Sequence, residues 1–293
     1  MKLAQKLALG YYRARLRVLA VISPRRAAAL AFDLFCTPFR RSDGSEPPVF
    51  KKATRLPLRV DGLEVAGYCW NRGQRKRILI VHGFESSALN FAFYINALVE
   101  SGFEVIGVDA PAHGASAGRQ ITLPLYVRCI EALVAVTGPP AAAMAHSFGG
   151  LALMHYLETA PVANTCRTAL LAPATETLSA VKSLFRLLHL SEALRPAFDE
   201  VSRQRGYKPY DYYSIRRILT NIHPPVLWVH DEEDEITPLA DVRPLIAEAP
   251  ANIEFMLTRG WGHRRIYREA EVQQKVISFL TAFPVAAAEH GHE

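Results

Sequence analysis

The apolar positions from residue 56 onward alternate between short runs and longer segments with helical spacing. Two short runs, residues 56–60 and 63–70, flank Asp61-Gly62 and therefore predict a β-hairpin. Further strands are predicted at residues 78–82, 103–109, 141–144, 168–172, 226–230 and 253–258, and helices at residues 90–101, 123–137, 151–157, 239–249 and 269–283. A hairpin followed by repeated β-α units predicts an α/β fold, with a mostly parallel twisted sheet of about eight strands and helices on both faces.

Two regions interrupt this alternation. Residues 1–22 predict a basic amphipathic helix, and Ser23-Pro24 begins a second helix that runs to about residue 35. Residues 175–223 hold another helix and a polar segment with four tyrosines, and an insertion at this edge of a sheet is a candidate cap. The predicted organisation is a leader with a linker (1–54), a core in two parts (55–174 and 224–284), a cap (175–223) and a tail (285–293).

The leader is basic and amphipathic, which leaves two interpretations open. Residues 1–60 hold 13 of the 34 Lys and Arg residues but only three of the 28 acidic residues. On a helical wheel, one side of this helix carries Leu3, Leu7, Tyr11, Val18 and Ile22. We favour packing on the domain, because most helices are stabilised by tertiary burial. The alternative is peripheral contact with an anionic membrane through residues 1–26, which fits this pattern better than contact with nucleic acid.

Composition excludes several classes of protein. Half of the residues are apolar and about a fifth are charged, as in an ordinary globular protein. The four cysteines show no CxxC spacing and no clustering with histidine, so we expect reduced thiols and no metal site. Arginines interrupt the first apolar run and Gly138-Pro139-Pro140 breaks the longest charge-free stretch, which argues against a signal peptide and a membrane span. We therefore predict a cytoplasmic protein, or one peripheral to the inner face of the membrane.

A serine in a tight strand-to-helix turn is the first candidate for chemistry. Ser147 follows a predicted strand and precedes a predicted helix, with Ala145 and Gly149 beside it. Small residues are needed at those two positions, because larger side chains would collide with the strand and the helix. Such a turn holds the Ser147 hydroxyl at the carboxyl edge of the sheet, with the amide of Phe148 facing the same space.

A serine hydroxyl needs a histidine base, and the histidine needs a carboxylate to orient it. Five carboxylates follow the predicted strand 226–230, and His263 follows the last predicted strand. Spacing alone leaves the choice open among Asp231, Glu232, Glu233, Asp234 and Glu235. A second oxyanion donor should come from the loop after an earlier strand, where the amide of Phe84 is well placed.

Taken in this order, the motifs resemble those of the α/β-hydrolase superfamily. The resemblance covers roughly residues 55–283 and rests on His82-Gly83-Phe84, Asp109-Ala110-Pro111-Ala112-His113-Gly114-Ala115-Ser116, the Ser147 turn, residues 230–238 and Gly262-His263. It implies an α/β-hydrolase fold with a helical cap, Ser147 as nucleophile and His263 as base. The family's His-Gly-x-x-Asp-x-x-x-Pro pattern points to Asp234 as the acid, although Asp231 stands where glycine is usual.

Other positions also depart from the pattern or invite a second interpretation. Ala145 replaces the first glycine of the family's serine turn, and a minority of the family takes its acid from the position that corresponds here to Glu176. His113 and Ser116 are expected to close a turn rather than to act in chemistry. Glu85 is unexpected beside an oxyanion loop, because its carboxylate would repel the oxyanion unless it turned outward. Supporting roles around the nucleophile are predicted for His82, Gly83, His146 and Gly149.

These features predict a serine hydrolase that cleaves a carboxylic ester through an acyl-enzyme on Ser147. The resemblance implies an esterase or lipase-like enzyme without a metal or organic cofactor, and the basic leader favours a small, lipid-derived acyl ester over nucleic acid as its partner. Thioester or amide hydrolysis, C–C bond cleavage and acyl transfer on the same three residues remain alternatives. A further alternative is a membrane-associated module that keeps the fold without turnover.

Overall fold

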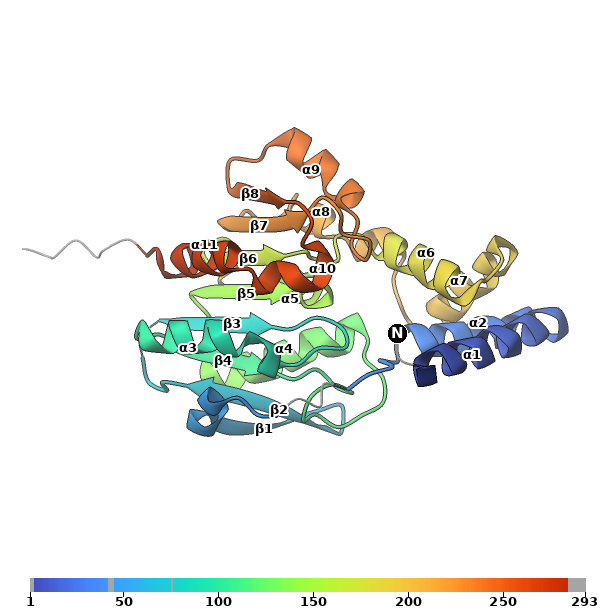
Figure 1. Ribbon diagram of the computed structural model, residues 1–293, viewed down its shortest axis with the longest axis horizontal. Coiled ribbons are helices and arrows are strands. Elements are labelled where there is room, and N and C mark those ends of the chain that lie inside the picture. Colours follow the sequence, from blue (N-terminus) through green and yellow to red (C-terminus); the bar gives the residue numbers. More distant parts are fainter. Residues whose placement is uncertain (1–2, 42–44, 75, 284–293) are drawn as a thin grey trace, which may run out of the picture.

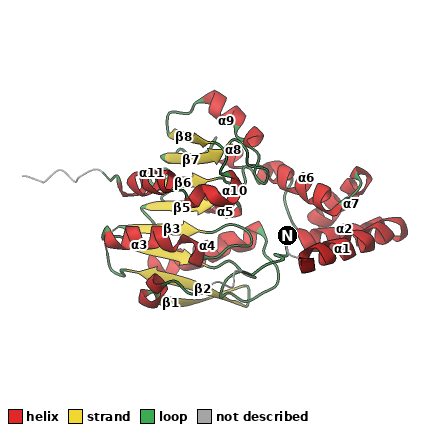
Figure 2. Ribbon diagram, viewed as in Figure 1, coloured by secondary structure: helices red, strands yellow, loops and turns green. Residues whose placement is uncertain are grey.

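An eight-stranded sheet organises the chain, in the order β1-β2-β4-β3-β5-β6-β7-β8. The computed structural model describes residues 3–41, 45–74 and 76–283. The strands are β1 (Thr54–Val60), β2 (Leu63–Trp70), β3 (Arg77–Val81), β4 (Glu104–Val108), β5 (Ala142–His146), β6 (Arg167–Leu171), β7 (Val226–Asp231) and β8 (Ile253–Thr258). The β1–β2 and β2–β4 pairs are antiparallel and all others are parallel (Figures 1 and 2). The predicted fold class is therefore confirmed.

Helices bury both faces of the sheet. On one face lie α3 (Ala92–Glu100) and α11 (Ala270–Thr281), and on the other lie α4 (Leu123–Thr137), α5 (Phe148–Thr159), α8 (Ile215–Ile218) and α9 (Arg243–Glu248). Strand β3 shows why both faces of the sheet exclude water, since Ile78 and Ile80 join one apolar cluster and Leu79 and Val81 join the other. The parallel strands consequently present their carboxyl ends together at one edge, where a nucleophile turn can be held rigidly.

A separate helical lobe stands beyond that edge of the sheet (Figure 1). It consists of α1 (Leu3–Ile22), α2 (Pro24–Phe35), α6 (Thr177–Leu188) and α7 (Arg195–Gln204). Its core joins Leu16 and Phe32 from the leader to Phe185 and Phe198 from the insertion. The sequence separates the leader from the cap, whereas in the structure the two pack together in this helical lobe.

The face of α1 that packs in the lobe is not the apolar side that the helical wheel identifies in the sequence. Leu9, Tyr12 and Leu19 contact the core of the lobe, while Leu7 and Tyr11 are exposed. The helix has two apolar faces, and the sequence does not reveal which of them has a partner. This packing agrees with the favoured interpretation of the leader, but it leaves the second face uncovered.

Some segments carry less regular structure than expected. The predicted helix 239–249 divides into a 3₁₀ turn (Leu239–Asp241) and α9, because Pro244 begins a new first turn. A short helix that the sequence did not predict, α10 (Gly262–Arg265), follows β8. Among the described residues, no helix is long and apolar enough to cross a membrane. The predicted tail, residues 285–293, lies outside the described residues.

Candidate active site

The turn between β5 and α5 holds Ser147 in a strained conformation. Its φ is 54° and its ψ is −125°, in a region that non-glycine residues rarely adopt. The turn is tight because α5 presses against the end of β3: a Cβ on Gly149 would lie 2.3 Å from the carbonyl oxygen of His82. Gly83 is also constrained, though less severely, since a Cβ there would lie 2.9 Å from His146 Nδ1 and 3.0 Å from the Cβ of Ser147. Glycine at these two positions therefore lets the loop after β3 approach the serine.

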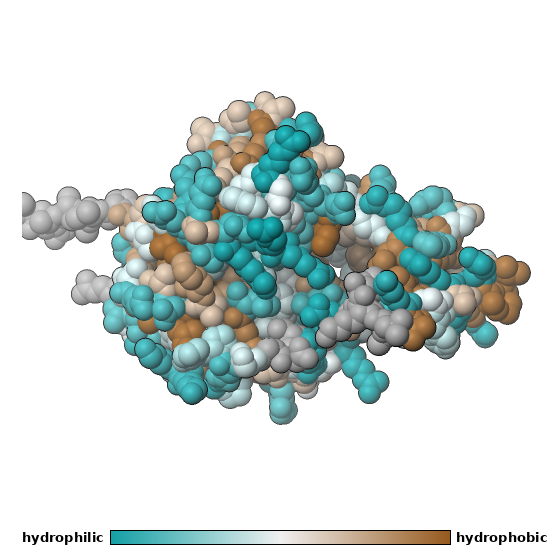
Figure 3. Space-filling view, in the orientation of Figure 1, coloured by the Kyte–Doolittle hydropathy of each residue, from teal (hydrophilic) through white to brown (hydrophobic). Residues whose placement is uncertain are grey.

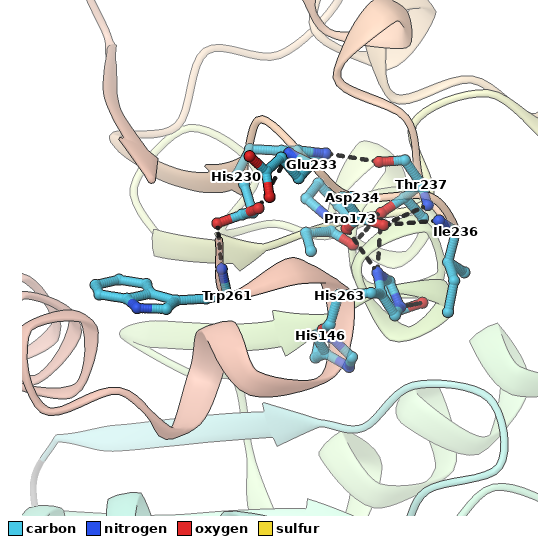
Figure 4. Close-up of polar contacts among 12 residues, drawn as sticks. His146, Pro173, His230, Glu233, Asp234, Ile236, Thr237, Trp261 and His263 are labelled. Carbon is cyan, nitrogen blue, oxygen red and sulfur yellow. Dashed lines mark hydrogen bonds and ion pairs between the residues drawn. The ribbon is translucent and has the colours of Figure 1, made fainter. Parts of the chain in front are cut away.

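Ser147, His263 and Asp234 form a continuous hydrogen-bonded chain. The Ser147 Oγ lies 2.9 Å from His263 Nε2, and His263 Nδ1 lies 2.8 Å from Asp234 Oδ2. His263 comes from α10, directly after β8, and Asp234 from the loop after β7 (Figure 4). Because the ionised carboxylate can only accept a hydrogen bond, Nδ1 carries the proton and Nε2 is free to accept one from Ser147. The structure thus brings together three residues that lie 29 to 116 positions apart.

Asp234 is held in one orientation by its own loop. Its Oδ1 accepts the N–H groups of Ile236 and Thr237 at 2.8 and 2.9 Å, and the Thr237 hydroxyl lies 2.8 Å from Oδ2. Burial by itself raises the pKa of this carboxyl, but the hydrogen bond and the charge of His263, together with the two N–H groups, outweigh burial and lower the pKa below its usual value. Asp234 is consequently an anion at neutral pH, as the orientation of His263 requires.

The competing carboxylates have other partners. Asp231 accepts hydrogen bonds from the N–H groups of Glu233 and Trp261 and from the Thr258 hydroxyl, so it fastens the loop before His263 without contacting the imidazole. Glu176 accepts a hydrogen bond from Ser214 at 2.9 Å. Among these carboxylates, Asp234 is the one that contacts His263.

Two backbone amides close to Ser147 have no hydrogen-bond partner among the described residues. Phe148 opens α5, so its N–H has no partner within the helix, and neither this amide nor that of Phe84 donates a hydrogen bond to any of the described residues. The loop that carries Phe84 is braced by His82, whose Nε2 accepts the N–H of Ala110 at 2.9 Å and whose carbonyl accepts the Tyr126 hydroxyl. Burial lowers the pKa of His82 to about 4, so this brace is neutral at physiological pH.

Comparison with known proteins agrees with this geometry. Residues 72–209 match the family described as "Serine aminopeptidase, S33". The pimeloyl-[acyl-carrier protein] methyl ester esterase of Xanthomonas oryzae pv. oryzae is 22% identical over 253 residues, which cover 72% of this chain and 98% of the relative. An esterase of Pyrococcus furiosus has a similar structure, with a TM-score of 0.64 and 17% identity over 84% of this chain and 96% of that one. The Paleococcus ferrophilus monoacylglycerol lipase gives a TM-score of 0.56 and 23% identity over 74% of this chain and 98% of that one.

The chain has the α/β-hydrolase fold, and it is similar to esterases of that superfamily. The matched family spans residues 72–209, which include Ser147 but neither Asp234 nor His263 among the predicted site residues. The roles of those residues therefore rest on their geometry in this α/β-hydrolase fold.

His146 packs against His263. Its Nε2 donates to the backbone carbonyl oxygen of His263 at 3.0 Å, and the two ring centroids are 4.7 Å apart (Figure 4). Burial lowers the pKa of His146 to about 3, so the residue adds no charge beside His263. His113 also acts through backbone contacts, because its Nε2 accepts the N–H of Glu85 at 3.0 Å.

Glu85 has a role that the sequence does not reveal. Its carboxylate accepts the backbone N–H of Phe39 at 3.0 Å and lies 3.8 Å from the guanidinium of Arg264. The carboxylate thus turns toward the chain that leaves α2, as the sequence requires of an acid beside an oxyanion loop. Thr237 is a second such residue, with its hydroxyl 3.1 Å from His263 Nδ1. The partners named here, Phe39, Arg264 and His263, lie 26 to 179 positions away along the chain, so no local pattern marks these contacts.

None of the groups of His, Cys, Asp and Glu side chains in the described part of the chain is arranged to hold a metal ion. The four cysteines are buried free thiols, and burial raises the pKa of Cys36 to about 12. These thiols are consequently poor nucleophiles at neutral pH.

Proposed function

We propose that the protein is a serine hydrolase that cleaves a carboxylic ester through an acyl-enzyme on Ser147. The observation that carries this proposal is the hydrogen-bonded chain from Ser147 Oγ through both ring nitrogens of His263 to Asp234, with links of 2.9 and 2.8 Å. A nucleophile, a base and an orienting anion in this geometry are what acyl transfer from an ester requires.

In the first half of the reaction, His263 Nε2 accepts the Ser147 hydroxyl proton while Oγ attacks the ester carbonyl carbon. The negative charge that develops on the carbonyl oxygen is stabilised by the amides of Phe84 and Phe148, and Asp234 stabilises the imidazolium. His263 then gives its proton to the leaving alkoxide, which departs as the alcohol and leaves the acyl group on Ser147.

In the second half, His263 accepts a proton from water, and the resulting hydroxide attacks the acyl carbon. The tetrahedral intermediate collapses, Ser147 recovers its proton from His263, and the carboxylic acid is released. Since the water replaces the alcohol at the same position, the same two amides serve both steps.

We further propose a small, lipid-derived acyl ester as substrate and peripheral contact of residues 1–26 with an anionic membrane. The half-buried rings of Phe84 and Phe148 lie 6.2 Å apart beside Ser147, and such apolar rings favour an acyl chain over a charged group. The names of two similar proteins support an acyl ester as substrate, since one is a pimeloyl-[acyl-carrier protein] methyl ester esterase and the other is a monoacylglycerol lipase.

The test combines active-site labelling with turnover. We expect a fluorophosphonate probe to label the wild-type protein and p-nitrophenyl esters of graded chain length to be hydrolysed. Ser147→Ala should abolish labelling, and Ser147→Ala and His263→Ala should each reduce kcat/KM by roughly 10³-fold or more. Matched controls are Ser101→Ala and His223→Ala, which alter exposed side chains elsewhere.

Near-normal hydrolysis by either active-site variant would contradict the proposal. Faster turnover of thioesters or amides than of the matched esters would reassign the reaction to another chemistry on the same residues. Folded wild-type protein that neither reacts with the probe nor hydrolyses any acyl substrate would indicate a module without turnover.

A further inference from the structure

The helix α1 carries an apolar face that no part of the described chain covers. We call this face the outer stripe, and it consists of Leu7, Tyr11, Val18, Val21 and Ile22. Their side chains are 58% to 85% exposed, with Val21 the most exposed of them. The spacing places all five on one side of the helix, opposite the side that packs in the lobe through Leu16. Exposed apolar side chains gather at the far end of the lobe in Figure 3.

Basic residues border the outer stripe on both sides. At 3.6 residues per turn, Arg15 lies beside one edge of the stripe, and Lys6 and Arg17 lie beside the other. The segment from residue 3 to residue 32 contains six basic residues and no acidic residue. These six are Lys6, Arg13, Arg15, Arg17, Arg25 and Arg26. Long basic side chains in this arrangement can extend from the apolar face to a plane of negative headgroups.

From these observations we propose that the outer stripe docks α1, and with it the helical lobe, onto the surface of an anionic lipid bilayer. The helix lies parallel to the surface, with Leu7, Val18 and Ile22 at the level of the acyl chains and the arginines among the phosphates. Tyr11 suits the same interface, because its ring is apolar and its hydroxyl can stay hydrated.

Charge decides between a bilayer and a second copy of this chain. Two copies that met through the outer stripe would bring two equally basic helices together, and the repulsion between like charges opposes such a contact. An anionic surface has the opposite charge and can neutralise every basic residue that borders the stripe. The bilayer is therefore the occupant that fits both the apolar and the charged parts of this face.

The docking rests on the leader and does not require the proposed ester hydrolysis. Its relation to the proposed reaction is spatial, because the lobe that would be docked stands beyond the sheet edge that carries Ser147 (Figure 1). An enzyme held in this way would meet its acyl ester at the bilayer surface, where lipid-derived substrates are concentrated.

The experiment uses the full chain and vesicles, with no substrate. We expect co-flotation with vesicles of phosphatidylcholine and phosphatidylglycerol in a three-to-one ratio, little with pure phosphatidylcholine, and less with either as salt increases. The triple variant Val18→Ser, Val21→Ser, Ile22→Ser should weaken partitioning about tenfold or more, and so should Arg15→Gln with Arg17→Gln.

Matched controls change exposed residues of the same types away from α1. They are Val136→Ser on α4, and Arg59→Gln with Arg72→Gln near the hairpin, and all of these should partition like wild type. Ser147→Ala should also bind normally, so a failure of the proposed catalysis and a failure of docking are separate results. Circular dichroism confirms that each variant is folded.

Unchanged partitioning of the outer-stripe variants would overturn the proposal, as would equal binding to neutral and anionic vesicles. A concentration-dependent dimer that the triple variant abolishes, without vesicle binding by the wild type, would assign the stripe to a second copy and would also overturn it.

Discussion

At the scale of single residues, the Thr237 hydroxyl contacts both Asp234 and His263. It lies 2.8 Å from Asp234 Oδ2, 3.1 Å from His263 Nδ1 and 3.2 Å from the carbonyl oxygen of Ala172. A hydroxyl has one proton and two lone pairs, so it can donate to one of these oxygens and accept from a neighbour. Thr237 therefore donates to Asp234 Oδ2, the shorter of the two contacts, and accepts from His263 Nδ1, which positions Asp234 against His263.

We predict that Thr237→Val lowers kcat by roughly tenfold and leaves KM nearly unchanged. The variant keeps the shape and the backbone N–H that binds Asp234, and it loses one hydrogen bond to a charged group, which contributes about 1.5–3 kcal/mol. Steady-state kinetics on the best ester measure the effect. Thr237→Ser should recover most of the activity, and Thr220→Val is the control at an exposed threonine. Full activity of Thr237→Val would remove this positioning role.

At this scale, the sequence predicts local motifs, such as the turn around Ser147, and it does not predict contacts between residues that are far apart along the chain. The turn around Ser147 is encoded by small neighbours within four positions, and its strained φ follows from that turn. The choice of Asp234 needed the resemblance, because five carboxylates lie within five positions of one another. The sequence drew attention to Glu85 but not to its partners, and it did not predict the contacts of Thr237, because these contacts form only when separate loops meet.

At the scale of elements, the two apolar faces of α1 have different energetic roles. Leu16 is fully buried between α2 and the insertion, whereas Leu7, on the same helix, is 67% exposed. The sequence predicted the approximate bounds of α1 and α2 and the existence of a helix in the insertion, which is α6. It did not predict their association, because periodicity describes one helix at a time and says nothing about which helix covers it.

We predict that Leu16→Ala destabilises the lobe by about 2–5 kcal/mol, because it leaves a cavity in a packed apolar core. Leu7→Ala is the matched control in the same helix and should change stability by no more than about 0.5 kcal/mol. Hydrogen exchange of α1, α2, α6 and α7 measures the difference. Fluorophosphonate labelling of Ser147 should persist in both variants. Equal protection of the lobe in the two variants would contradict this assignment of faces.

At the scale of the whole molecule, five buried histidines make the fold sensitive to acid. Burial lowers the pKa of His82, His113 and His155 to about 4, that of His146 to about 3, and that of His230 as well, while an unfolded chain keeps a value of about 6.5. Between these values the unfolded chain binds more protons than the folded one. The contribution of these histidines to the free energy of unfolding therefore falls as the pH falls through this window and is fully present above it.

We predict that the free energy of unfolding is several kcal/mol lower at pH 5 than at pH 7, at roughly 1.4 kcal/mol per pH unit for each histidine. Urea titrations at the two pH values measure it. His155→Gln should reduce the pH dependence by about a fifth, because one of the five groups is then absent. His223→Gln, at an exposed position, should leave it unchanged. A urea midpoint independent of pH would contradict the prediction.

The contact between Phe39 and Glu85 ties the leader to the reaction centre. Glu85 has a left-handed backbone, with φ of 55°, and directly follows Phe84, whose amide we propose as an oxyanion donor. Its carboxylate accepts a hydrogen bond from the backbone N–H of Phe39, in the segment that follows α2. If the four helices rotate away from the sheet, either this hydrogen bond breaks or the strained turn at Glu85 moves with the helices. A mechanical disturbance at the first helices of the protein can thus reach the oxyanion loop without altering Ser147, His263 or Asp234.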